Sequence, residues 1–186
     1  AEKQFNLEAE RNGGKPTTDG YRNLYQAYKL AGMDLHAAQT LEEMNDLYPN
    51  NSNLNEIGVL FSSAGNKEKA IEYYEKAYES NPANSTVAFN LALQYKSTDP
   101  SKFVEMLETV LKLEPNDPEA LFEKGKLQTK KNKGDGMALI EKAFNNYKAK
   151  VDNNRLKDWE FSWFESCARE LKKLDIHRRG DGTRRL

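Results

Sequence analysis

The residue types that usually carry out chemistry are rare in this sequence. It has one cysteine, Cys167, and two histidines that lie far apart. One cysteine cannot form an internal disulfide, and two distant histidines do not make the ligand set of a zinc site. His36, next to Ala37, is expected to cap a helix or to face water rather than to act as a base. We therefore expect no catalytic residue, no metal and no cofactor.

Two short segments resemble ligand-binding loops but lack the residues that such loops need. Residues 12–17, Asn-Gly-Gly-Lys-Pro-Thr, have the composition of a phosphate loop. They lack the upstream glycine spacing, and a proline follows the lysine where serine or threonine should open a helix. Asp135 lies between two glycines, without the alternating carboxylates of a calcium loop. We expect Asp135 to be the N-cap of a helix.

Charge and hydropathy exclude two further classes of partner. The chain has 28 basic and 29 acidic side chains, whereas a dedicated nucleic-acid binder is usually strongly basic. The mean hydropathy is −0.88, and no apolar run approaches the ~18 residues of a membrane span. We expect no nucleic-acid partner and no membrane partner. A cytoplasmic location is favoured, with a signal peptide cleaved before Ala1 as the alternative.

The strongest pattern in the sequence is an internal repeat. Pro49, Pro82 and Pro115 are spaced 33 residues apart, and each follows an amphipathic run. A period near this length is typical of stacked helical hairpins. Between the prolines the pattern is helix, short turn, helix. In 51–84 the turn contains Gly65, which can adopt the left-handed conformation that ends a helix.

Residues 54–82 resemble a tetratricopeptide repeat. The residues that carry the resemblance are, in sequence order, Leu54, Ile57, Gly58, Phe61, Ala70, Tyr74, Ala77 and Pro82. Small Gly58 and Ala70 would let the two helices approach, and Phe61 and Tyr74 would fill the space beside them. Three further segments follow the same pattern: 18–50, 85–117 and a degenerate 118–150. In 85–117, Asp99 is expected to cap a helix that begins at Pro100.

The resemblance implies an all-α fold, a right-handed superhelix of tetratricopeptide hairpins over 18–150. Residues 1–17 form a lead segment with a short helix at 3–11. Residues 155–175 are expected to form a C-terminal capping helix, because the last open face of a solenoid must be covered. Its apolar stripe is Leu156, Trp159, Trp163, Phe164, Cys167, Leu171 and Leu174. Cys167 is expected to be an inert buried thiol, and 176–186 a flexible basic tail.

Tetratricopeptide proteins generally bind partner polypeptides, so the resemblance implies a non-enzymatic adaptor or scaffold. In that family the first helix of each hairpin lines a concave groove. The corresponding residues here are Arg22, Gln26, Asn55, Val59, Phe89, Leu93, Lys96, Phe122, Lys126 and Lys130. This set predicts a protein or peptide partner with apolar anchors and acidic flanks. In the alternative interpretation, Phe89 and Phe122 pack against a neighbouring repeat.

Two other functional hypotheses remain open at this point. The chain could be the regulatory or scaffold domain of a larger enzyme or multidomain protein. It could also form a homodimer through an exposed edge rich in tyrosine, with Tyr21, Tyr25 and Tyr28 in the first repeat. The chaperone-tail clamp found in some tetratricopeptide domains is not expected, because Glu56 would stand at one of its positions and repel an acidic tail.

Overall fold

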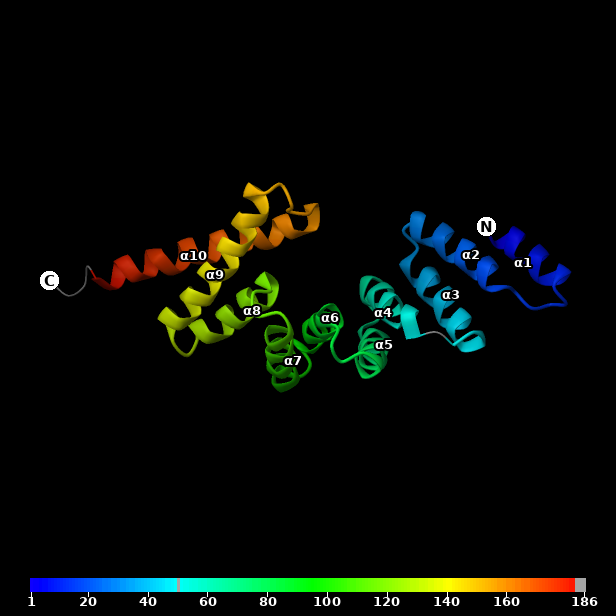
Figure 1. Ribbon diagram of the computed structural model, residues 1–186, viewed down its shortest axis with the longest axis horizontal. Coiled ribbons are helices and arrows are strands. Elements are labelled where there is room, and N and C mark those ends of the chain that lie inside the picture. Colours follow the sequence, from blue (N-terminus) through cyan, green and yellow to red (C-terminus); the bar gives the residue numbers. More distant parts are fainter. Residues whose placement is uncertain (50, 183–186) are drawn as a thin grey trace. The chain divides into compact units, whose positions relative to one another are not determined.

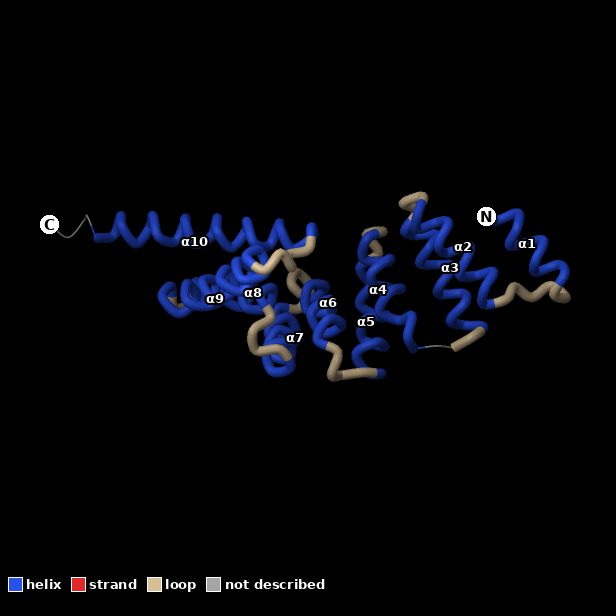
Figure 2. Tube along the Cα trace, turned by 45° about the horizontal axis from the view of Figure 1, so that its top comes forward, coloured by secondary structure: helices blue, strands red, loops and turns tan. Residues whose placement is uncertain are grey.

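The computed structural model describes residues 1–49 and 51–182, with the side chains of all of these except Asn51 and 175–182. Every described element is a helix, and short loops connect them (Figures 1 and 2). In chain order they are α1 (Glu2–Arg11), α2 (Thr18–Leu30), α3 (Asp34–Leu47), η1 (Asn51–Asn53), α4 (Leu54–Ser63), α5 (Lys67–Ser80), α6 (Ser85–Tyr95), α7 (Pro100–Leu113), α8 (Pro118–Thr129), α9 (Lys133–Asp152), η2 (Asp158–Glu160) and α10 (Phe161–Gly182). The elements η1 and η2 are single 3₁₀ turns.

The helices form two compact units, Ala1–Phe103 and Val104 onward, called unit 1 and unit 2 below. Each of the four predicted repeat segments holds two α-helices. The pairs are α2 with α3, α4 with α5, α6 with α7, and α8 with α9. The C-terminal helix is shifted from the predicted range of 155–175, because it begins only at Phe161, after the 3₁₀ turn η2. It runs to Gly182 and so includes residues 176–182 of the predicted flexible tail, while 183–186 lie outside the described residues.

Two glycines explain how the hairpin of α4 and α5 closes. A Cβ on Gly58 would lie 2.8 Å from the ring of Tyr74, so only glycine allows the two helices to approach this closely. Gly65 in the turn has φ 78°, the left-handed conformation that the sequence predicted. The loop ends at Asn66, whose side chain accepts a hydrogen bond from the backbone N–H of Lys69 and caps α5.

The predicted helix starts were correct at one position and wrong at another. Asp99 accepts hydrogen bonds from the backbone of Ser101 and Lys102, and α7 begins at Pro100. Asp135, however, is not an N-cap. Asn132 caps α9 by accepting from the N–H groups of Gly134 and Asp135, which places Asp135 inside the first turn. There its negative charge still favours the helix N-terminus.

Helix α1 contacts two of the three tyrosines that were expected to form an exposed edge, Tyr21 and Tyr28. Tyr21 is fully buried, and its ring meets that of Phe5 edge to face, with 5.0 Å between the ring centres. Tyr25 is also buried, and the hydroxyl of Tyr28 donates to Glu2. Tyr21 and Tyr25 therefore do not form an open edge, and a homodimer through other surfaces stays a prediction.

In unit 2, α10 packs on α9 around one apolar cluster. Its buried members are Leu121, Phe122, Ile140, Ala143, Tyr147 and Cys167, and Leu156, Trp163, Phe164, Leu171 and Leu174 are partly buried against it. The predicted stripe of the C-terminal helix is therefore largely an inner face. Trp159 is the exception, since it precedes α10 and is 58% exposed.

Candidate functional site

The predicted groove residues of unit 1 lie on the first helices of its hairpins. Arg22 and Gln26 are exposed on α2, Asn55 and Val59 are half-buried on α4, Phe89 and Leu93 are half-buried on α6, and Lys96 is exposed at the end of α6. We call these seven residues the first-helix face. Residues four apart on a helix stack above one another, so Asn55 with Val59, and Phe89 with Leu93, each form one row along their helix.

Hydrogen bonds between side chains join the first helices to one another. Asn90 Nδ2 donates to Asn55 Oδ1 at 3.1 Å, and Gln94 Nε2 donates to Ser62 Oγ at 2.9 Å. Both bonds link α6 to α4. The row that faces α4 on α6 therefore consists of Asn90 and Gln94, and Phe89 and Leu93 form the adjacent row on the same helix.

A charged group joins α4 to α2. Glu56 accepts from the hydroxyl of Tyr25 at 2.7 Å and from the ammonium of Lys29 at 2.5 Å. Burial acts to raise the pKa of Glu56, but the hydrogen bonds from Lys29 and Tyr25 outweigh it, and the pKa is lowered. The hydrogen bond with Glu56 raises the pKa of Lys29. Glu56 is thus an ionised carboxylate, paired with Lys29, that links α4 to α2.

The groove residues predicted from the sequence did not include the polar residues that make these hydrogen bonds between helices. Glu56, Asn90 and Gln94 lie 31, 35 and 32 residues from their respective partners Tyr25, Asn55 and Ser62. Separations close to the 33-residue period are the signal that could have identified them, because equivalent positions of adjacent hairpins lie side by side.

The predicted residues of unit 2 have a different role. Phe122 is 5% exposed, and its ring meets Trp163 of α10 edge to face, with 5.9 Å between the ring centres. Lys126 Nζ lies 5.3 Å from the centre of the Phe122 ring and 3.8 Å from Glu123, and Lys130 is exposed at the end of α8. Phe122 is therefore a core residue, and its burial by α10 removes it as an anchor for a partner.

The most buried polar groups also lie in unit 2. Glu119 and Tyr147 are buried, and neither Glu119 Oε1 nor the Tyr147 hydroxyl makes a hydrogen bond of good geometry, although the two groups face each other. Burial, reinforced by the charge of Asp117, raises the pKa of Glu119. Burial also raises the pKa of Cys167 to about 12, so its thiol stays protonated and is a poor nucleophile.

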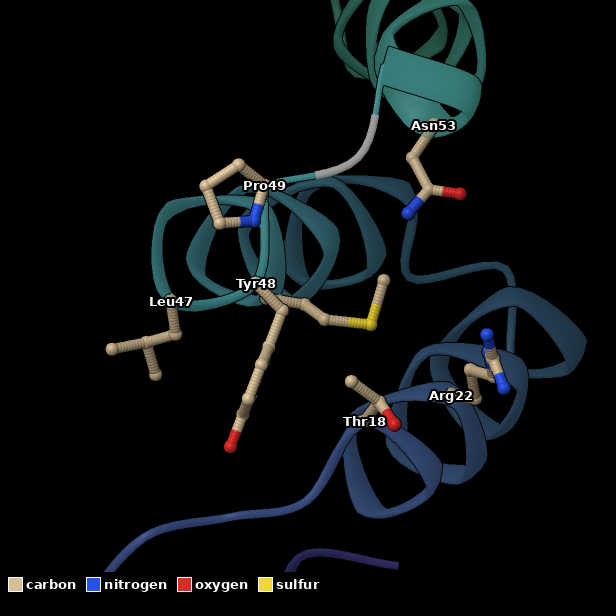
Figure 3. Close-up of a pocket in the computed structure, with 7 residues that line it drawn as sticks. Thr18, Arg22, Leu47, Tyr48, Pro49 and Asn53 are labelled. Atoms are coloured by element: carbon tan, nitrogen blue, oxygen red, sulfur yellow. The ribbon is translucent and has the colours of Figure 1, made fainter.

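A hollow in unit 1 lies where α2 begins and α3 ends. It has a volume of 410 Å³ and is lined by Thr18, Arg22, Met44, Leu47, Tyr48, Pro49 and Asn53 (Figure 3). Among the described residues no group of three or more histidine, cysteine, aspartate or glutamate side chains could hold a metal ion. The hollow is therefore a surface for binding, lined by apolar and polar side chains.

Residues 52–84 match the model of the tetratricopeptide repeat family. The chain therefore contains a tetratricopeptide repeat at 52–84, and it shares the fold of solved tetratricopeptide-repeat proteins. No curated protein has a sequence that matches it. In its described part, the chain has no helix that is both long enough and apolar enough to cross a membrane.

Solved structures share the fold of this chain at low sequence identity. A crystal structure of MamA aligns with a TM-score of 0.59 at 13% identity, over 86% of this chain and 97% of that one. MamA residues 41 to the end, from Desulfovibrio magneticus RS-1, align with a TM-score of 0.58 at 17% identity, over 86% and 94%. YrrB, described as a TPR protein with an unusual peptide-binding site, aligns with a TM-score of 0.59 at 15% identity, over 74% of each chain.

Proposed function

We propose that this protein is a non-enzymatic adaptor or scaffold, and that unit 1 binds an extended polypeptide along its first-helix face. The family and the fold support a protein-interaction module. The observation that carries the site is a row of half-buried apolar side chains, Phe89 and Leu93, beside the amide pair Asn55–Asn90. Apolar anchors next to fixed polar groups are the usual composition of a peptide-binding surface.

The amide pair supplies a means of holding a peptide backbone. The bond from Asn90 to Asn55 uses one atom of each amide. The second atom of each amide, Asn55 Nδ2 and Asn90 Oδ1, can then donate to a backbone carbonyl and accept from a backbone N–H. Because each amide is already fixed by its neighbour, less side-chain entropy is lost on binding.

The charges on this face favour a partner with acidic residues beside its apolar anchors. Arg22 and Lys96 are exposed on α2 and at the end of α6, and Glu56 between them is paired with Lys29. Exposed charges of this kind mainly set orientation and association rate. A binding role for Lys126 and Lys130 of α8 stays a prediction, as does a homodimer.

Selection of peptides from a random phage library on the full chain tests this proposal. We expect enriched peptides to carry an aromatic or aliphatic residue next to acidic ones. Phe89→Ala should weaken their binding at least about tenfold, as measured by fluorescence polarisation. Leu35→Ala is the matched control, since Leu35 is an exposed apolar residue on α3, outside the face.

A second variant separates loss of binding from loss of folding. Asn90→Ala removes the amide pair without removing apolar area, and we expect it to weaken binding while the helical circular dichroism and melting temperature stay close to those of the wild type. Enriched peptides that bind Phe89→Ala and Asn90→Ala as tightly as the wild type would contradict the proposal.

A further inference from the structure

The hollow between the start of α2 and the end of α3 has walls of two kinds. Its apolar floor and side are Met44, Leu47, Tyr48 and Pro49. Leu47 is 55% exposed and Tyr48 is 37% exposed, whereas most large apolar side chains of unit 1 are buried. Its polar rim is Thr18, Arg22 and Asn53 (Figure 3). A volume of 410 Å³ lies within the range of ~300–1,000 Å³ that is typical of ligand pockets.

The apolar wall is held in place by the chain around it. The hydroxyl of Tyr48 donates to the carbonyl oxygen of Pro16 at 2.9 Å, which satisfies the polar tip of the ring and leaves its apolar body to line the hollow. Met44 is buried at the base, 4% exposed. Because these side chains are already ordered, an apolar group that enters the hollow does not have to order them.

The cation on the rim is only weakly engaged within the protein. Arg22 Nη1 donates to Asp19 Oδ1 at 3.2 Å, and both side chains are mostly exposed. An exposed pair of this kind contributes little. A guanidinium has five donors in a planar fork, so a second carboxylate can bind Arg22 beside Asp19 or in its place.

We propose that this hollow is a second binding site, which takes a large apolar side chain of a partner polypeptide that has a carboxylate next to it. The apolar side chain would lie on Met44, Leu47 and Tyr48, and the carboxylate would meet Arg22, with Thr18 and Asn53 able to hydrogen-bond the adjacent backbone. The charge of Arg22 is what selects an acidic ligand over a neutral one. This site shares Arg22 with the first-helix face, but it does not require peptide binding at Phe89 and Leu93.

The test uses N-acetyl-leucine, which joins a leucine side chain to a carboxylate, and N-acetyl-leucinamide, which has the same shape without the charge. Each is titrated into the ¹⁵N-labelled full chain and followed by two-dimensional NMR. We expect saturable shifts of the Thr18, Leu47 and Asn53 amides, with a dissociation constant on the order of millimolar for a ligand this small. The neutral amide should bind more weakly, by up to about fivefold.

Substitutions test the contributions of the charged rim and of the apolar wall to binding separately. Arg22→Gln should bind both compounds equally, at the affinity of the neutral amide, whereas Arg11→Gln in α1 should leave the difference between them intact. Leu47→Ser should weaken both compounds alike. All three positions are exposed, and unchanged amide dispersion verifies the fold. The absence of saturable shifts around the hollow, or a preference for the acid that persists in Arg22→Gln, would overturn the proposal.

Discussion

Replacing Glu119 with glutamine should stabilise the protein, although it removes a charge from a chain rich in ion pairs. Glu119 is 6% exposed, and its Oε1 has no hydrogen bond of good geometry. The charged and titratable groups that act on it are Asp117 at the start of its own helix, Tyr147 and Lys150 on α9, and Cys167 on α10. Burial raises the pKa of Glu119, and Asp117 raises it further. The folded state therefore disfavours the charged form.

The sign of the pH dependence follows from that direction. A raised folded pKa means that Glu119 stabilises the fold fully below its unfolded pKa of about 4.3, and that this contribution is lost as pH rises through the folded pKa. Glutamine never acquires the charge. Because a neutral amide costs less to bury than a carboxylate, the variant should gain on the order of 1 kcal/mol at neutral pH. For a chain of this size, that gain raises the melting temperature by about 2–4 °C.

Glu160 provides a matched control in the same unit. It is also buried, but it accepts from Lys150 and from the backbone N–H of Lys157, and these bonds outweigh burial and lower its pKa. Its contribution is present above the unfolded pKa and is lost as pH falls through the lowered folded pKa. Glu160→Gln should therefore destabilise at neutral pH.

Urea unfolding of Glu119→Gln, Glu160→Gln and the wild type between about pH 2 and pH 8 measures both effects, because the lowered Glu160 pKa lies below its unfolded value of about 4.3. The gain of Glu119→Gln should grow as pH rises, and the loss of Glu160→Gln should shrink as pH falls. If Glu119→Gln is less stable than the wild type at pH 7, or if its effect is the same at every pH, the reasoning from desolvation fails.

The other predictions concern close packing and a buried thiol. Gly58→Ala should lower the free energy of unfolding by about 1–3 kcal/mol in urea titrations, because its Cβ would meet the Tyr74 ring at 2.8 Å. Gly134→Ala, whose Cβ would have a nearest neighbour at 3.5 Å, should be neutral or slightly stabilising, and equal losses at both sites would contradict the packing argument. Cys167 should react with a thiol-specific disulfide reagent only after denaturation, since it is fully buried with its pKa raised to about 12, and rapid labelling of the native protein would show that α10 opens.

Local backbone rules allowed much of this fold to be predicted from the sequence. Gly65 in a left-handed turn and Asp99 before Pro100 each follow from one residue and its immediate neighbours. Asp135 failed under the same rules because Asn132, three residues earlier, is an equally good cap and provides the bond to the helix N-terminus. The sequence did not indicate which of the two would be used, since both stand in a loop rich in glycine and polar residues.

The candidate site was harder to predict, for a reason that Phe89 and Phe122 make clear. The two residues are 33 positions apart and so hold equivalent positions in the repeat. Phe89 is half-buried on α6, whereas Phe122 is buried under Trp163 of α10. A periodic sequence pattern predicts the same role for both residues. Their burial differs because α10, which belongs to no repeat, covers Phe122. The apolar part of the first-helix face is therefore confined to α4 and α6, and substituting Phe122 should reduce stability through the core of unit 2 without acting directly on a bound peptide.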